Sequence, residues 1–102
     1  MGKSQQRELY NRLAVLVAHL LKWQYQPERR GSSWQKTIKI QRIDIKKLLK
    51  DNPSLKSQLN ESLLECYEKA KLIAETETQL EVFPDQCTYS LVEVLDDRFY
   101  PD

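Results

Sequence analysis

The residues best suited to chemistry in this chain gather between positions 19 and 42. The only histidine, both tryptophans and a pair of adjacent arginines stand within one short stretch. A histidine can act as a general base, and arginines can stabilise the charge that develops during phosphoryl transfer. A metal-independent ribonuclease needs a set of this kind. The candidate functional cluster comprises His19, Lys22, Trp23, Arg29, Arg30, Trp34 and Arg42.

A structural interpretation of the same cluster is the one that we favour. No carboxylate is obviously placed in the sequence to orient His19, and no glycine-rich phosphate loop is present. In this interpretation His19 is a hydrogen-bonded side chain in a crowded helix, and Trp23 and Trp34 are core aromatics. The adjacent arginines cap the carbonyls at the end of the first helix. We therefore name no catalytic residue, and the sequence favours a protein that is not an enzyme.

Charge is divided unevenly along the chain. Residues 1–50 carry twelve basic and three acidic side chains, a net charge of +9. Residues 51–102 carry four basic and twelve acidic side chains, a net charge of −8, so that the whole chain has +1. The basic residues can form a nucleic-acid surface on which Trp23, Tyr25 or Trp34 stacks bases. Alternatively, and in our preferred interpretation, the opposed charges are used within the chain, where a basic second helix lies against an acidic third helix, or between subunits. The rows expected to face each other are Lys39, Arg42, Lys46 and Lys50 and, opposite them, Glu61, Glu65 and Glu68.

The two cysteines do not suggest a disulfide framework or a metal site. Cys66 and Cys87 are too few for such a framework and indicate reduced thiols in a cytoplasmic protein. One histidine and two distant cysteines fall short of the four ligands that zinc usually takes. The apolar run over residues 13–18 is too short to span a bilayer. We therefore expect no metal, no cofactor and no membrane.

Hydrophobic spacing predicts three long helices. With two glycines and four prolines, the chain has few residues that interrupt a helix. Apolar residues at helical spacing indicate helices over about 4–24, 33–51 and 53–76. The first is apolar on nearly every side, which is typical of a buried central helix. We predict an all-α fold, a small up-and-down bundle of three long helices and a short C-terminal one.

Cap residues set the predicted boundaries of these helices. Ser33 and Asn52 are expected to cap the starts of the second and third helices. Ser90 and Glu93 have capping-box spacing and should open the short C-terminal helix. Residues 79–102 otherwise form an irregular tail that packs on the bundle. We accordingly assign residues 1–102 to a single helical domain.

The sequence also resembles a known family. Residues 19–34 read His-Leu-Leu-Lys-Trp-Gln-Tyr-Gln-Pro-Glu-Arg-Arg-Gly-Ser-Ser-Trp. Further matching residues are Gln41-Arg42, Asn52-Pro53-Ser54-Leu55, Phe83-Pro84 and Cys87-Thr88-Tyr89. On these residues the chain resembles the bacterial family named "domain of unknown function twenty-nine", over nearly its whole length. The resemblance implies an all-helical, uncharacterised protein and supplies no activity. Family members usually begin with an acidic and aromatic segment and another helix, and we expect this leading segment to be missing here.

These observations lead to one expected function and two alternatives. We expect a non-enzymatic helical protein-interaction module that self-associates or binds a protein partner. The first alternative is a nucleic-acid-binding protein that uses the basic face of residues 22–50, with weak binding. The second is a small nuclease centred on His19. We expect a homo-oligomer, because a helix that is apolar almost all round has few other elements to cover it.

Overall fold

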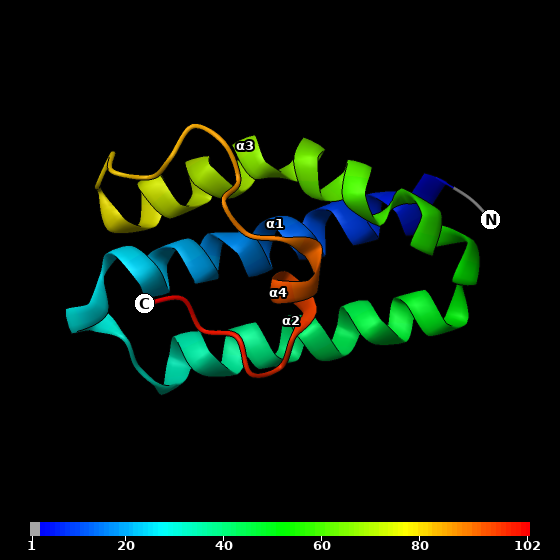
Figure 1. Cartoon of the computed structure of the whole chain (residues 1–102), viewed down its shortest axis with the longest axis horizontal. Coiled ribbons are helices and arrows are strands. Elements are labelled where there is room, and N and C mark those ends of the chain that lie inside the picture. The colour runs from blue at the N-terminus through cyan, green and yellow to red at the C-terminus, as the bar shows by residue number, and fades with distance from the viewer. Residues whose placement is uncertain (1–2) are drawn as a thin grey trace.

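Three long helices run side by side in the computed structural model, which describes residues 3–102 (Figure 1). The elements in chain order are α1 (Lys3–Tyr25), the 3₁₀ helix η1 (Pro27–Arg29), α2 (Ser32–Asp51), the 3₁₀ helix η2 (Pro53–Gln58), α3 (Leu59–Thr78) and α4 (Leu91–Leu95). The described residues contain no strand. The predicted all-α bundle of three long helices and one short helix is confirmed.

The first long helix, α1, is the centre of the bundle. It packs along both α2 and α3, which lie on opposite sides of it in Figure 1. The chain reverses at η1 and again at η2, so α1 and α3 run in one direction and α2 runs in the other. Leu13, Leu16, Val17 and Leu20 are all fully buried. The prediction of a buried central first helix is confirmed, since its apolar sides face two neighbours instead of one.

The start of α2 differs from the sequence prediction. Gly31, in extended conformation, occupies the N-cap position, and the helix begins at Ser32. The predicted cap, Ser33, lies inside the first turn, where its carbonyl accepts a hydrogen bond from the hydroxyl of Thr37 at 3.1 Å. Glycine is also accepted at an N-cap, and this shifts the boundary by two residues.

The start of α3 also differs, because Asn52 serves the preceding helix. Its side-chain amide donates to the carbonyl of Leu48 at 3.1 Å and so satisfies the end of α2. No side-chain hydrogen bond from Asn52 caps the next element. The chain then forms η2, and regular α geometry begins only at Leu59. The predicted cap was wrong because the Asn52 side chain turns back to the Leu48 carbonyl, which also accepts the Asn52 backbone amide at 2.9 Å.

The C-terminal tail crosses the bundle from α3 to α2 (Figure 1). The Ser90 hydroxyl accepts from the Glu93 amide at 3.1 Å, and the Glu93 carboxylate accepts from the Ser90 amide at 2.9 Å. This confirms the predicted capping box at the start of α4. Phe83, Tyr89 and Val94 are buried, so the tail packs on the bundle as expected.

The basic row of α2 and the acidic row of α3 do not face each other. In the described chain α2 and α3 each pack along α1 and not along one another. On α2, Lys46 instead pairs with Asp97 of the tail at 2.9 Å. The expected neutralisation between the two rows within one chain is therefore wrong, because the central helix separates them.

Replacing Leu16 with alanine should lower the free energy of unfolding by about 2–5 kcal/mol, since neither flanking helix can move in without leaving the other. Chemical denaturation followed by circular dichroism measures the change. The control Leu64→Ala removes the same atoms from a side chain that is 74% exposed on α3. This control should cost less than about 0.5 kcal/mol. A loss below about 1 kcal/mol at Leu16 would show that α1 is not the centre of the fold.

Candidate functional site

Arg42 is completely buried although its side chain is charged. Its Nε donates to the carbonyl of Val94 at 2.9 Å, and its Nη2 donates to the carbonyls of Phe99 at 2.8 Å and Glu93 at 3.4 Å. The guanidinium carbon lies 5.5 Å from the centre of the Tyr100 ring. Burial lowers the pKa of Arg42. We expected Arg42 in an exposed basic row, and that expectation is wrong. The N–H donors of its guanidinium group match the arrangement of carbonyls in the tail, and this allows the side chain to be buried.

The environment of Arg42 compensates its charge mainly with dipoles. Its partners are backbone carbonyls and an aromatic ring, while Asp97 and Asp96 act on it from a distance. Its Nη1 and the hydroxyl of Tyr100 are buried without a hydrogen-bond partner among the described residues. Arg42 therefore links α2 to the tail through these hydrogen bonds, and it is not available to bind phosphate.

A second arginine, Arg30, links the end of α1 to the last residues of the chain through hydrogen bonds. The Nε of Arg30 donates to the carbonyl of Trp23 at 2.7 Å, and its Nη2 donates to the carbonyl of Pro101 at 3.2 Å. The guanidinium carbon lies 5.4 Å from the Trp23 ring centre. That ring in turn lies 5.0 Å from the ring of Tyr100. The expected capping of helix carbonyls is thus confirmed for Arg30, whereas Arg29 is exposed on η1.

A third contact joins all three long helices around Lys22. The side chain is only 5% exposed, and its Nζ lies 2.5 Å from Oε1 of Glu77 on α3. The same Nζ lies 4.8 Å from the centre of the Trp34 ring on α2. Lys22 is therefore held by a carboxylate on one side and by an aromatic face on the other.

His19 is hydrogen-bonded within its own helix. Its Nδ1 lies 2.8 Å from the carbonyl of Val15, and because a carbonyl only accepts, this nitrogen carries the proton. Burial lowers the pKa of His19 from its ordinary 6.5, and the nearby Lys22 lowers it further, while Val15 and Glu77 act in the opposite direction. The ring is therefore neutral at neutral pH, and its contact is the one expected from a structural role.

Neither cysteine is poised for nucleophilic chemistry. Burial raises the pKa of the Cys66 thiol to about 12, and burial also raises the pKa of the Cys87 thiol. A catalytic cysteine requires the opposite shift, since the thiolate is the nucleophile. Within residues 3–102, no group of three or more His, Cys, Asp and Glu side chains is placed to hold a metal ion.

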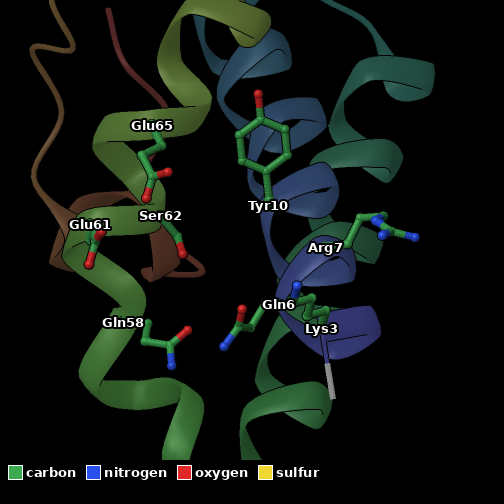
Figure 2. A pocket seen from close by; sticks show the side chains of 8 residues that line it. All are labelled: Lys3, Gln6, Arg7, Tyr10, Gln58, Glu61, Ser62 and Glu65. Carbon is green, nitrogen blue, oxygen red and sulfur yellow. The ribbon is translucent and has the colours of Figure 1, made fainter. Parts of the chain in front are cut away.

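A groove of about 620 Å³ lies at the other end of the bundle, between the starts of α1 and α3 (Figure 2). Figure 2 shows Gln6 and Gln58 reaching toward each other from the two walls. The α1 wall carries Lys3 and Arg7. The opposite wall consists of Gln58 at the end of η2 and of Glu61, Ser62 and Glu65 on α3. The lining contains no histidine or cysteine, so the groove offers polar contacts and no general base of the histidine kind.

Two stripes on the outer helices, exposed except at the half-buried Glu75, were missed by the sequence analysis. We call Lys36, Ile40, Ile43, Lys47 and Lys50 the basic seam of α2. We call Glu61, Glu65, Glu68, Leu72 and Glu75 the acidic seam of α3. Both follow alternating steps of four and three residues, the spacing of one helix face. Ile40 and Ile43 are 53% and 63% exposed, and Leu72 is 56% exposed. The signal in the sequence was a second apolar-containing stripe opposite the buried one.

The fold and these contacts define a class of protein: a small helical bundle in which Arg30 and Arg42 hold a C-terminal tail across the helices by hydrogen bonds. The chain belongs to the family described as "Domain of unknown function DUF29", whose family model matches residues 1–100. The resemblance seen in the sequence is thus confirmed. No curated protein and no solved structure matches the chain. In the described part of the chain, no helix is both long and apolar enough to cross a membrane.

Replacing Arg42 with alanine should destabilise the protein by about 3–5 kcal/mol, because buried carbonyls of the tail lose their donor. Chemical denaturation measures the total loss, and hydrogen exchange should show the earliest opening in residues 90–100. Arg42→Lys should recover only part of the loss, since one ammonium cannot reproduce the fork. The control Lys39→Ala, at an exposed position of the same helix, should cost less than about 0.5 kcal/mol. Unchanged exchange in the tail would contradict the role given to Arg42.

Acid should destabilise the protein partly through His19. Its folded pKa is below its ordinary value of 6.5, so at lower pH the unfolded chain binds the proton more readily. The free energy of unfolding should therefore fall as the pH drops through about 6.5 toward the lower folded pKa. His19→Gln keeps an amide donor for Val15 and removes this titration. Denaturation at a series of pH values should show a smaller acid loss in the variant, and identical profiles would refute the shift.

Proposed function

We propose that this protein is a non-enzymatic interaction module that binds a protein partner through the basic seam. The observation that carries the proposal is the pair of exposed isoleucines, Ile40 and Ile43, at the middle of a row of lysines. The exposed side chains of α2 form this face, while its opposite side packs into the core. Apolar side chains at the centre with charges around them are the usual anatomy of a protein-binding surface.

The positions of the candidate catalytic residues support a role without turnover. Arg42 and Arg30 donate to backbone carbonyls, and Lys22 is paired with Glu77. His19 donates to a carbonyl of its own helix. Phosphoryl transfer needs groups of this kind directed at a substrate, whereas here their donors are already directed at the protein itself.

A nucleic-acid partner is the alternative that the free lysines favour. Lys36, Lys39 and Lys50 are exposed and make no ion pair among the described residues. Two observations favour protein over nucleic acid. The tryptophan rings that would stack on bases contact Tyr100 and Lys22 instead. Exposed isoleucines contribute to binding when the partner has an apolar surface. The phosphates of a nucleic acid would interact only with the lysines.

Self-association would use the outer faces of the bundle. The sequence argument for a homo-oligomer was the apolar surface of the first helix, but the apolar residues of α1 are covered within one chain. The exposed large apolar side chains of the described residues are Ile40, Ile43, Leu64, Leu72, Val82 and Val92. Four of these six lie on α2 and α3, so an apolar contact with any partner is best supplied there.

Photo-crosslinking at Ile40 tests the proposal against its alternative. A photoreactive amino acid replaces Ile40 in one variant and Val82 in the control, since both side chains are 53% exposed. In cells, the variant at position 40 should give adducts that protease destroys and nuclease does not. The adduct's protein should then rebind the purified chain and lose binding to Ile43→Glu. Nuclease-sensitive adducts would support nucleic acid instead, and equal adducts at both positions would refute the seam as an interface.

A further inference from the structure

The acidic seam of α3 carries negative charges, whereas the basic seam of α2 carries positive charges. Its glutamates, Glu61, Glu65, Glu68 and Glu75, form no ion pair within the described residues. Leu72 on the seam and Leu64 beside it are 56% and 74% exposed. Each seam therefore combines apolar side chains with charges of one sign, and the two seams have opposite signs.

The two seams also match in length and spacing. Both contain five residues at alternating steps of four and three. In an antiparallel alignment the pairs are Lys36 with Glu75, Ile40 with Leu72, Ile43 with Glu68, Lys47 with Glu65, and Lys50 with Glu61. A parallel alignment would instead place Ile40 against Glu65 and Lys47 against Leu72. The antiparallel register is favoured because it pairs apolar with apolar and lysine with glutamate at four of the five positions.

These faces cannot meet within one molecule. The helices α2 and α3 lie on opposite sides of α1 (Figure 1), and their seams are on the sides opposite their buried residues, with Glu61 and Glu65 also lining the groove beside α1. The charges of opposite sign that the sequence suggested would neutralise internally thus remain separated. A second copy of the same chain is a partner that carries the matching seam in the right spacing.

We propose that the basic seam of one copy docks antiparallel on the acidic seam of a second copy. This inference rests on the proposed function above and names its partner. Because α2 and α3 already run antiparallel on opposite sides of α1, antiparallel docking keeps neighbouring copies in the same orientation. The contact is therefore heterologous, and the pair still offers a free acidic seam on the first copy and a free basic seam on the second. The assembly grows head to tail.

The physical terms of this contact predict its behaviour in solution. Exposed lysine–glutamate pairs contribute little affinity each and are weakened by salt, so they set register and partner choice. The apolar pair Ile40 and Leu72, with Leu64 at the flank, contributes the burial of hydrophobic area. A contact between two single helices is small, so association should be weak and should increase with concentration.

Charge reversal with recombination tests the proposal. The first variant is Lys47→Glu with Lys50→Glu, and the second is Glu61→Lys with Glu65→Lys. Each variant alone places like charges opposite each other at the junction, so each should be monomeric in sedimentation velocity where the wild type forms a series of oligomers. An equal mixture restores opposite charges at both kinds of junction. It should regain wild-type association at tens to hundreds of micromolar protein and low salt.

The controls separate this inference from folding and from the proposed function. Arg29→Glu with Lys56→Glu makes the same change in net charge as the first variant, at exposed sites outside the seams, and it should associate like the wild type. Circular dichroism should show all variants equally helical. A wild type that stays monomeric, or a mixture that does not recover, overturns the head-to-tail contact. If Ile40 still crosslinks to a different protein in that case, the proposed function stands while this inference falls.

Discussion

The buried guanidinium of Arg42 is the constraint on which the path of the tail depends. A charge enclosed in the core must be compensated, and no carboxylate provides its hydrogen bonds. Its acceptors are carbonyls of residues 93, 94 and 99, which lie on α4 and on the chain after it. These carbonyls converge on one point of α2 only if the tail turns there. The capping box at Ser90 and the ring of Tyr100 therefore have their positions set by one side chain far away in sequence.

The same constraint accounts for the contacts of the arginines Arg30 and Arg42 in the candidate cluster. A short bundle with an irregular tail has many free carbonyls, and arginine is the side chain best able to satisfy several at once. Arg30 does so at the end of α1, and the Trp23 and Tyr100 rings cover the cations. A sequence cluster of histidine, arginine and tryptophan is therefore compatible with contacts that hold the tail on the bundle. Only the direction of their donors distinguishes it from an active site.

Local features of the sequence were predictable, and contacts between distant elements were not. The buried stripe of α2, with Ile38, Ile45 and Leu48, follows from helical periodicity, as does the burial of α1. The interior place of Arg42 does not, because it depends on carbonyls some fifty residues away. The paired rows of charge failed for a related reason. Sequence shows that two helices carry opposite charges, but it does not show which helix lies between them.

The separation of charge by α1 gives the molecule two chemically different sides with a nearly neutral total. The fold does not need either side, since the core contacts of α2 and α3 are on their opposite faces. Exposed ion pairs would add little to stability even if they formed within the chain. The exposed lysines and glutamates of the two seams, of which Lys47 pairs with Asp51 at 3.2 Å, therefore have no function in folding that the core contacts require. The interaction proposed above would use their regular spacing on two helices, where surface residues can change while the buried contacts keep the scaffold unchanged.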